Sequence, residues 1–485
     1  MHDFDGSILR RGLSSLVEHP FLLVSFSIYK GLSSLLFFLE PALPSAVPAF
    51  LGHATSATCI CVAIVLCCVF FAATGRKLAV FNSPRYLAPM ASALIVGVLC
   101  LCYVTPYITL PLPQLVCWAG ALLLTCAGAC SIHIEFGRLM GYLGSTYTLI
   151  FNAGCSFTGL PITVALLLMP TLARAILSSA LVVAMIYTFA RSLYAIGKEE
   201  VYGVSDAELS IPWRFLGTSF AQGVAIGLTV TLFSRSSAMG LSLVVVSVCL
   251  AATAALLFGL VMRVDFDTLV YRIGFCAIGF GCTLFTLAPA GGFASQLPQF
   301  ALFVAYVFLD IVLWSLGSHL IKSCNQPAIW VAACPSASLM TGRIVGSALG
   351  VLRLGGAIDA DNAHEILAFA TVATFMFMAV AVLMSSSNNL RSGWGFIKLT
   401  DENVHTEREW ACKLIAEDFR LTDRERDVLE LLALGMSRSD IADALVVAPN
   451  TVKTHIRNIY AKLDVHSNAE LLKFVAHQQR AFEAH

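Results

Sequence analysis

Long apolar segments fill the first 390 residues of the chain and predict membrane-spanning helices. A helix that crosses a bilayer needs about 20 mostly apolar residues, and about twelve segments meet this requirement. They lie at residues 20–39, 54–74, 87–105, 114–132, 146–169, 172–190, 215–233, 240–262, 270–290, 298–318, 328–352 and 363–385. The eleventh is the least apolar, because it contains Pro335 and Arg343. We therefore predict an all-α fold in which residues 1–390 form a polytopic membrane bundle.

The pattern changes after the last apolar segment. Residues 385–395 are polar and rich in Ser, Asn and Gly, a composition that ends helices. Residues 405–419 return to helical periodicity, with Trp410 and Leu414 on one face. We predict a linker helix within residues 391–420 and a separate module over residues 421–485. The linker is either a passive spacer or a segment that pairs with a second copy.

Helix start and stop signals divide this module into four predicted helices. A capping box pairs a hydroxyl with a carboxylate three residues later, Pro favours a first helical position, and Gly ends a helix. In chain order the signals are the capping box Thr422/Glu425, Gly435, the capping box Ser437/Asp440, Pro449 and the capping box Ser467/Glu470.

The third predicted helix has one apolar face and one polar face. The apolar face predicts a buried stripe formed by Val452, Ile456, Ile459 and Leu463. The polar face carries Asn450, Lys453, Thr454 and Arg457, with Thr451, His455 and Lys462 beside it. Such a face suits the major groove of double-stranded DNA, which admits one helix. An ordinary solvated helix face is the alternative interpretation.

The module resembles the LuxR/FixJ-type helix-turn-helix family. The resemblance is carried by Leu421, Thr422, Arg424, Glu425, Val428, Leu429, Gly435, Ile441, Ala442, Leu445, Thr451, Val452, Lys453, His455, Ile456, Asn458, Ile459, Tyr460, Lys462, Leu463 and Val465. It implies that the third helix enters the major groove and that the fourth helps to form a homodimer on DNA. By position, Lys453, Thr454 and Arg457 are then candidates to read bases, and Thr451 and His455 to contact the backbone.

Two residues depart from the pattern of that family. Ala448 stands where a Ser or Thr usually caps the recognition helix, and Asn468 replaces an Arg that is common near the start of the fourth helix. Loss of a cap costs about 1 kcal/mol, so we expect the recognition helix to fray more in the absence of DNA.

Composition and charge support the division into two parts. The chain has 485 residues, 58% of them hydrophobic and 12% charged, whereas a typical soluble domain has about 25% charged residues. Residues 400–485 hold 11 Lys/Arg and 15 Asp/Glu, and the 399 residues before them hold only 19 and 15. The net charge of zero therefore describes neither part, and it leaves DNA binding open because that depends on a local basic face.

Signatures of metal, cofactor or catalytic sites are missing from the sequence. Fifteen of the 16 Cys precede residue 400, mostly in apolar segments, where Cys behaves as a small hydrophobe. We find no Cys–His spacing typical of zinc, no phosphate-binding loop and no nucleophile–base set. We therefore predict no metal site, no cofactor and no enzymatic activity.

The loops predict the orientation of the bundle, because cytoplasmic loops are rich in Lys and Arg. Placing the N-terminus inside puts most of these residues on the cytoplasmic side, among them Arg76, Lys77 and Arg391. We expect a multi-pass protein of the inner (plasma) membrane with both termini in the cytoplasm.

Three charges lie near the middle of apolar segments: Lys30, Asp310 and Arg343. Charges inside a membrane are costly and usually face the bundle interior with a partner. One interpretation is a polar ligand cavity in which Asp310 balances one or both cations, and the alternative is a structural ion pair. Two cations against one carboxylate favour an anionic ligand.

About twelve spans with both ends inside, together with Gly75-Arg76-Lys77 after the second span, resemble the major facilitator superfamily. The whole chain is similar to bacterial membrane regulators that fuse such a bundle to a LuxR-type module. This implies a one-component transcriptional regulator, in which a small molecule of unknown identity binds the bundle and controls operator binding. The alternative is a secondary transporter with a DNA-binding regulatory tail.

Overall fold

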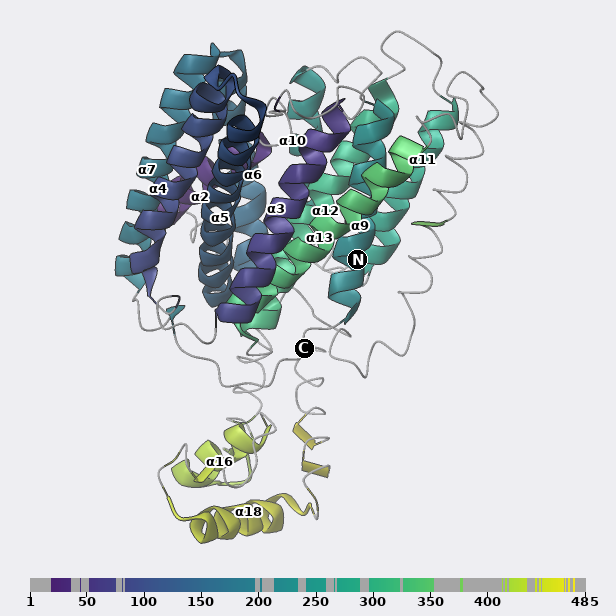
Figure 1. Cartoon of the computed structure of the whole chain (residues 1–485). Helices are drawn as coiled ribbons and strands as arrows, with labels where there is room; N and C mark the ends of the chain where they lie inside the picture. The colour runs from purple at the N-terminus through teal and green to yellow at the C-terminus, as the bar shows by residue number, and fades with distance from the viewer. Residues whose placement is uncertain are drawn as a thin grey trace. The chain divides into compact units, whose positions relative to one another are not determined.

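The computed structural model describes residues 19–35, 44, 52–75, 81–196, 201–202, 213–233, 241–258, 266–287, 296–322, 326–352, 376–377, 412–433 and 441–475, with gaps of one or two residues inside some of these ranges. The chain divides into two compact units, Met1–Leu399 and Thr400–His485. Every regular element in the described ranges is helical (Figure 1). The predicted span at residues 363–385 lies almost entirely outside the described residues. Most of the predicted linker also lies outside them.

The first unit, here called the membrane unit, is built from long apolar helices that run alongside one another (Figure 1). They are α2 (Pro20–Leu35), α3 (Gly52–Thr74), α4 (Leu87–Leu99), α5 (Pro111–Leu143), α6 (Ser145–Leu168), α7 (Thr171–Ile196), α9 (Trp213–Phe233), α10 (Leu241–Leu256), α11 (Cys276–Leu287), α12 (Leu297–Lys322) and α13 (Ala328–Leu352). Short turns of tighter or wider helix flank α4 at Pro84–Tyr86, Cys100–Val104 and Thr105–Tyr107, and Thr268–Phe275 precedes α11. Each of the first eleven predicted spans falls on one of these helices.

Length and composition allow seven helical segments in the described part to cross a membrane. These segments include α13, in spite of Pro335 within it. The two numbers do not cover the same residues, because the predicted spans at 20–39, 240–262, 270–290 and 363–385 lie partly or almost wholly outside the described part.

Glycine lets two pairs of helices approach until their backbones touch. On α9, a Cβ added at Gly223 would collide with the carbonyl oxygen of Leu339 on α13 and would lie 2.9 Å from the backbone nitrogen of Arg343. On α2, a Cβ at Gly31 would lie 2.9 Å from the carbonyl oxygen of Gly159 on α6. Small residues at such crossings are the usual means by which membrane helices pack, because lipid provides no hydrophobic driving force between them.

A buried polar cluster fixes the C-terminal half of α5. The Glu135 side chain is 1% exposed and accepts hydrogen bonds of 2.5 Å from the hydroxyls of Tyr86 and Tyr202. Arg138 lies 3.5 Å from the same carboxylate and donates to the Phe81 carbonyl at 3.0 Å. The cluster joins α5 to segments before α4 and after α7, so these buried charges help to hold the bundle together.

The second unit, the C-terminal unit, has its own apolar core. Its long helices are α16 (Asp423–Ala433) and α18 (Pro449–Leu463). The core residues are Cys412, Ile415, Val428, Leu429, Leu432, Ala433, Ile441, Ala442, Val452, Ile456, Ile459, Leu463, Val465, Leu471 and Val475. This set confirms the predicted buried stripe on α18. It also contains Cys412 and Ile415, so the end of the predicted linker is part of the core.

We expect the close crossing of α9 and α13 to tolerate no side chain. Gly223→Ala should lower the free energy of unfolding by about 1–3 kcal/mol, because overpacking forces neighbouring atoms apart. Thermal unfolding of the detergent-solubilised chain measures this change. Gly120→Ala on α5 is the matched control, since a Cβ there meets nothing within 4 Å. Equal stability of the two variants would show that the backbones do not touch.

Candidate DNA-binding surface

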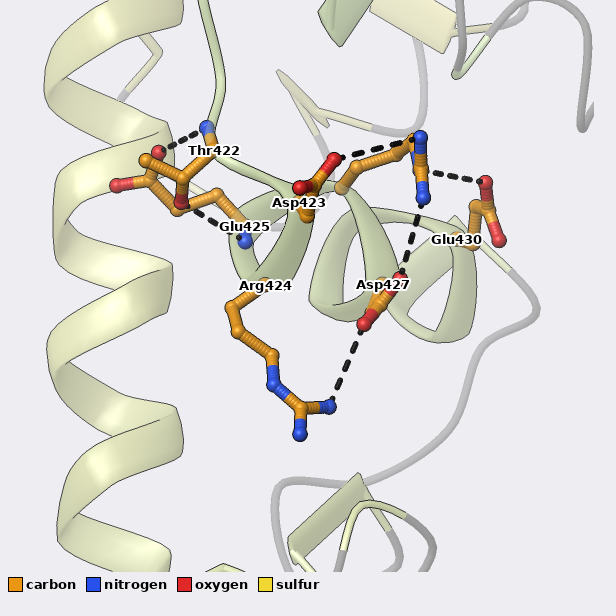
Figure 2. Close-up of polar contacts among 7 residues, drawn as sticks. Thr422, Asp423, Arg424, Glu425, Asp427 and Glu430 are labelled. Atoms are coloured by element: carbon orange, nitrogen blue, oxygen red, sulfur yellow. Dashed lines mark hydrogen bonds and ion pairs between the residues drawn. The ribbon is translucent and has the colours of Figure 1, made fainter.

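The capping box predicted at the start of α16 is formed (Figure 2). The backbone N–H of Thr422 donates to Glu425 Oε2 at 2.8 Å, and the N–H of Glu425 donates to Thr422 Oγ1 at 3.3 Å. At the fourth predicted helix, the N–H of Glu470 donates to Ser467 Oγ at 3.2 Å. The predicted box at Ser437 and Asp440 lies outside the described residues. The start signals that can be compared therefore mark true helix starts.

The carboxylate of this box also ties α16 to the end of α18. Lys462 Nζ donates to Glu425 Oε2 at 2.7 Å and to the Arg420 carbonyl at 3.0 Å. Arg420 has a positive φ of 50°, and Glu425 is buried at 4% exposure. The ammonium of Lys462, which the sequence places beside the predicted DNA-binding face, is thus paired within the unit. We propose that Lys462 fixes the position of α18 instead, because one charge paired at 2.7 Å is a poor phosphate ligand.

The same contacts change the acidity of Glu425. Burial acts to raise its pKa, but the hydrogen bonds from Lys462 and Thr422 outweigh burial and lower the pKa from 4.5 to about 2. Other ion pairs on α16, such as Arg424–Asp427 at 3.4 Å and Arg426–Glu430 at 3.8 Å, are more exposed (Figure 2). Exposed pairs contribute little to stability, so Glu425 is the carboxylate that matters for this unit.

Helix α18 begins without a side-chain cap, as the sequence predicts. Ala448 occupies the N-cap position in an extended conformation, and no side chain bonds to the first turn there. Pro449 is the first helical residue, and the helix ends at Asp464 in the left-handed conformation, whose N–H bonds to the Tyr460 carbonyl. Two amides of the first turn already donate to the Ala448 carbonyl, that of Thr451 at 2.8 Å and that of Val452 at 3.3 Å. The positive end of the helix dipole still attracts negative charge there.

The predicted base-reading residues share one exposed face of α18. Lys453, Thr454 and Arg457 are exposed, as are Asn450 and Thr451 at the start of the helix. The Thr454 hydroxyl donates to the Asn450 carbonyl at 3.0 Å. His455 differs, because it is half-buried and its Nδ1 is enclosed with no hydrogen-bond partner among the described residues. The face is therefore polar and basic, and the described residues of the unit leave it exposed, whereas His455 lies at its edge.

In the membrane unit, the structure brings together two of the three mid-span charges. Lys30 Nζ of α2 lies 2.6 Å from Asp310 Oδ2 of α12. Arg343 is on α13, where its backbone packs against Gly227 of α9. A cavity of about 120 Å³ is lined by Asp310 and by residues of α5, α9, α12 and α13. Neither Lys30 nor Arg343 is among its described lining residues.

Sequence reasoning missed His133, which lines this cavity from α5. Its Nδ1 is 2.7 Å from the Tyr29 hydroxyl and its Nε2 is 3.1 Å from Ser336 Oγ. A single His in an apolar helix gives no sequence signal, because its partners lie 104 and 203 residues away.

Comparison with known proteins identifies the C-terminal unit. Residues 420–475 match the family model GerE, bacterial regulatory proteins of the luxR family. A relative from Escherichia coli, the "Uncharacterized response regulatory protein YgeK", is 42% identical over 72 residues, which are 15% of this chain and 49% of that protein. The "Nitrate/nitrite response regulator protein homolog" of Haemophilus influenzae is 45% identical over 60 residues, 12% of this chain and 29% of that protein. The chain thus spans half or less of the length of these two relatives.

Among solved structures, the Major Facilitator Superfamily transporter FucP in its outward conformation matches 77% of this chain and 99% of its own, with 14% identity and a TM-score of 0.44. The C-terminal unit therefore carries a helix-turn-helix domain of the luxR family, as its sequence predicts.

We expect the stability of the C-terminal unit to fall in acid. Because the pKa of Glu425 is lower in the folded state, its ionised carboxylate stabilises the unit at pH above 4.5. This stabilisation is lost as the pH falls toward about 2. The loss is on the order of 3 kcal/mol. Glu425→Gln should remove this dependence on pH, because it removes the carboxyl group that binds roughly one proton on unfolding. Urea unfolding of the fragment Thr400–His485 at pH values from about 6 down to about 2 measures the effect. Glu430→Gln, at an exposed pair, should retain it, and a wild-type profile in Glu425→Gln would contradict the assignment.

Proposed function

We propose that this protein is a membrane-bound one-component transcriptional regulator. A small molecule binds in the membrane unit, and binding controls sequence-specific DNA recognition by the C-terminal unit. The observation that carries the proposal is the exposed face of Lys453, Thr454 and Arg457 on α18, opposite a fully buried apolar stripe, within the segment that matches the luxR family.

The residues of this face have separate roles in the proposal. Lys453 and Arg457 donate to guanine edges, and Thr454 offers a hydroxyl and a methyl group to a base edge. Asn450 and Thr451, at the uncapped start of α18, contact the phosphate backbone, where the positive end of the helix dipole favours an anion. His455 at the edge of the face is a further backbone contact. Two copies of the module bind as a homodimer to a roughly palindromic operator, since paired half-sites mirror the symmetry of a dimer.

The membrane unit supplies the control in this proposal. The apolar helices suited to crossing a bilayer support a membrane location, and in this proposal the C-terminal unit lies in the cytoplasm, where it can reach DNA. A ligand can shift such a protein between two states only by binding one of them more tightly. The cavity beside Asp310 is the site that we propose for this ligand.

Substitutions on the exposed face should weaken DNA binding selectively. Lys453→Ala and Arg457→Ala should each reduce operator affinity about ten- to a hundredfold, which corresponds to the loss of a base contact. The operator is first selected from random double-stranded DNA by the full chain in lipid nanodiscs, and affinities are then measured by fluorescence anisotropy. Arg424→Ala is the control, because its side chain is 63% exposed on α16. Equal losses in all three variants would contradict base reading by α18.

The proposal also requires the C-terminus to face the cytoplasm. An epitope tag fused after His485 should remain unlabelled by antibody in intact spheroplasts and become labelled once the membrane is permeabilised. A periplasmic protein serves as the control for labelling efficiency. Labelling of the tag in intact spheroplasts would exclude regulation by direct DNA binding.

A further inference from the structure

The cavity in the membrane unit combines one carboxylate with an aromatic wall. Asp310 lines it together with Trp314 of α12 and Phe215 of α9, and polar atoms come from His133, Gln222 and Ser336. Asp310 is the acidic residue among the described lining residues, and none of these is a Lys or Arg. Its volume of about 120 Å³ suits a molecule built around a single small ring.

Asp310 is shared between this cavity and an internal cation. The Asp310 side chain is 47% exposed, whereas that of Lys30 is 11% exposed. The carboxylate therefore receives the Lys30 ammonium at 2.6 Å while it still presents accessible surface to the cavity. Among the described lining residues the charged group is the Asp310 carboxylate, which Lys30 neutralises until its ammonium is displaced. The anionic ligand expected from two cations against one carboxylate does not suit this geometry.

The surroundings of the Lys30 ammonium resemble a binding site for an amine. Its Nζ lies 5.8 Å from the ring centroid of Phe26 and 5.7 Å from that of Trp314, beside the Asp310 carboxylate. Aromatic faces and a carboxylate are the groups with which proteins bind alkylammonium ions. Both Trp314 and Asp310 also line the cavity, so the groups that hold Lys30 are within reach of a ligand.

We propose that the cavity binds a small molecule with an ammonium group on an apolar, ring-sized body, and that this ammonium competes with Lys30 for Asp310. The inference rests on the proposed sensory role of the membrane unit. Lys30 occupies the amine site in the absence of ligand. When a ligand displaces it from Asp310, its ammonium stays against the rings of Phe26 and Trp314, and the ion pair between α2 and α12 is lost.

A second, uncharged connection limits what the release of Lys30 does. Tyr29, the neighbour of Lys30 on α2, remains joined through its hydroxyl to His133 on α5. Thr163 of α6 also donates to the carbonyl of Gly31 at 2.9 Å. Helix α2 therefore stays in the bundle when the ligand binds and changes only its contact with α12. This is the kind of limited rearrangement between two packed states that a switch requires.

The test compares three probes of similar size and different charge: benzylamine, benzyl alcohol and benzoate. Binding to the full chain in lipid nanodiscs is measured by isothermal titration calorimetry without DNA. We expect the wild type to bind benzylamine in preference to the other two. Lys30→Met should raise the affinity for benzylamine about tenfold or more, because the competing state is removed. Asp310→Asn should abolish benzylamine binding.

Thermal unfolding gives a second readout. Lys30→Met leaves the Asp310 carboxylate without its partner, so benzylamine should raise the unfolding temperature of this variant more than that of the wild type. If Lys30→Met fails to fold, Lys30→Gln provides the same comparison with the wild type. If Asp310→Asn fails to fold, the benzylamine affinities of the wild type and the Lys30 variants are sufficient for the test. Preference for benzoate, equal benzylamine affinity in wild type and Lys30 variants, or no binding of any probe would each overturn the proposal.

The outcome is separable from that of the proposed function. Operator selection in the absence of any probe tests DNA recognition by itself. Benzylamine binding without DNA binding would refute the regulatory role and leave the cavity assignment intact. DNA binding without benzylamine binding would refute the cavity assignment and leave DNA recognition by the C-terminal unit intact.

Discussion

A charge that lies inside a membrane bundle must be paired there, because lipid offers it nothing. The desolvation of a lone ammonium or carboxylate is so costly that such residues persist only with partners. In this protein the rule accounts for the Lys30–Asp310 contact between α2 and α12 and for the Glu135 cluster at the end of α5. Both join segments that are distant in sequence. The arrangement of the helices depends on them as much as on apolar packing.

The two clusters differ in their access to a ligand. Glu135 is enclosed by two tyrosine hydroxyls and Arg138 and has 1% of its side chain exposed. Asp310 retains nearly half of its surface, and that surface borders a cavity. A fully satisfied carboxylate has no capacity left for a further partner. A carboxylate that is held on one side and open on the other can exchange one cation for another.

The C-terminal unit uses a carboxylate in a third way. Glu425 accepts from the backbone at the start of α16 and from the ammonium near the end of α18. The Glu425 side chain thus caps the start of α16 and holds the end of α18 against it. Since α18 carries the proposed base-reading residues, its placement relative to α16 decides how they meet the groove. In our proposal, Lys462 serves recognition by pairing with Glu425 and so holding α18 in place.

Local signals in the sequence were enough to predict the helices and the faces of α18. The capping box at Thr422, the missing cap at Ala448 and the stripe from Val452 to Leu463 all depend on residues within a few positions of one another. The contacts of Lys462, His133 and Arg343 were not predictable in this way. Each depends on which helices become neighbours, and periodicity does not contain that information. The pairing of Lys30 with Asp310 was foreseen only because a buried charge demands some partner.

Cys412 can serve as a probe of the stability of the C-terminal unit. It is the single Cys after residue 400 in the sequence, and it is completely buried in the core of the C-terminal unit. A thiol in such a place reacts with an alkylating reagent only during moments when the core opens. The rate of its modification, followed at Cys412 itself by peptide mass spectrometry because the chain has 15 other cysteines, therefore reports the local opening free energy of this unit in the intact protein.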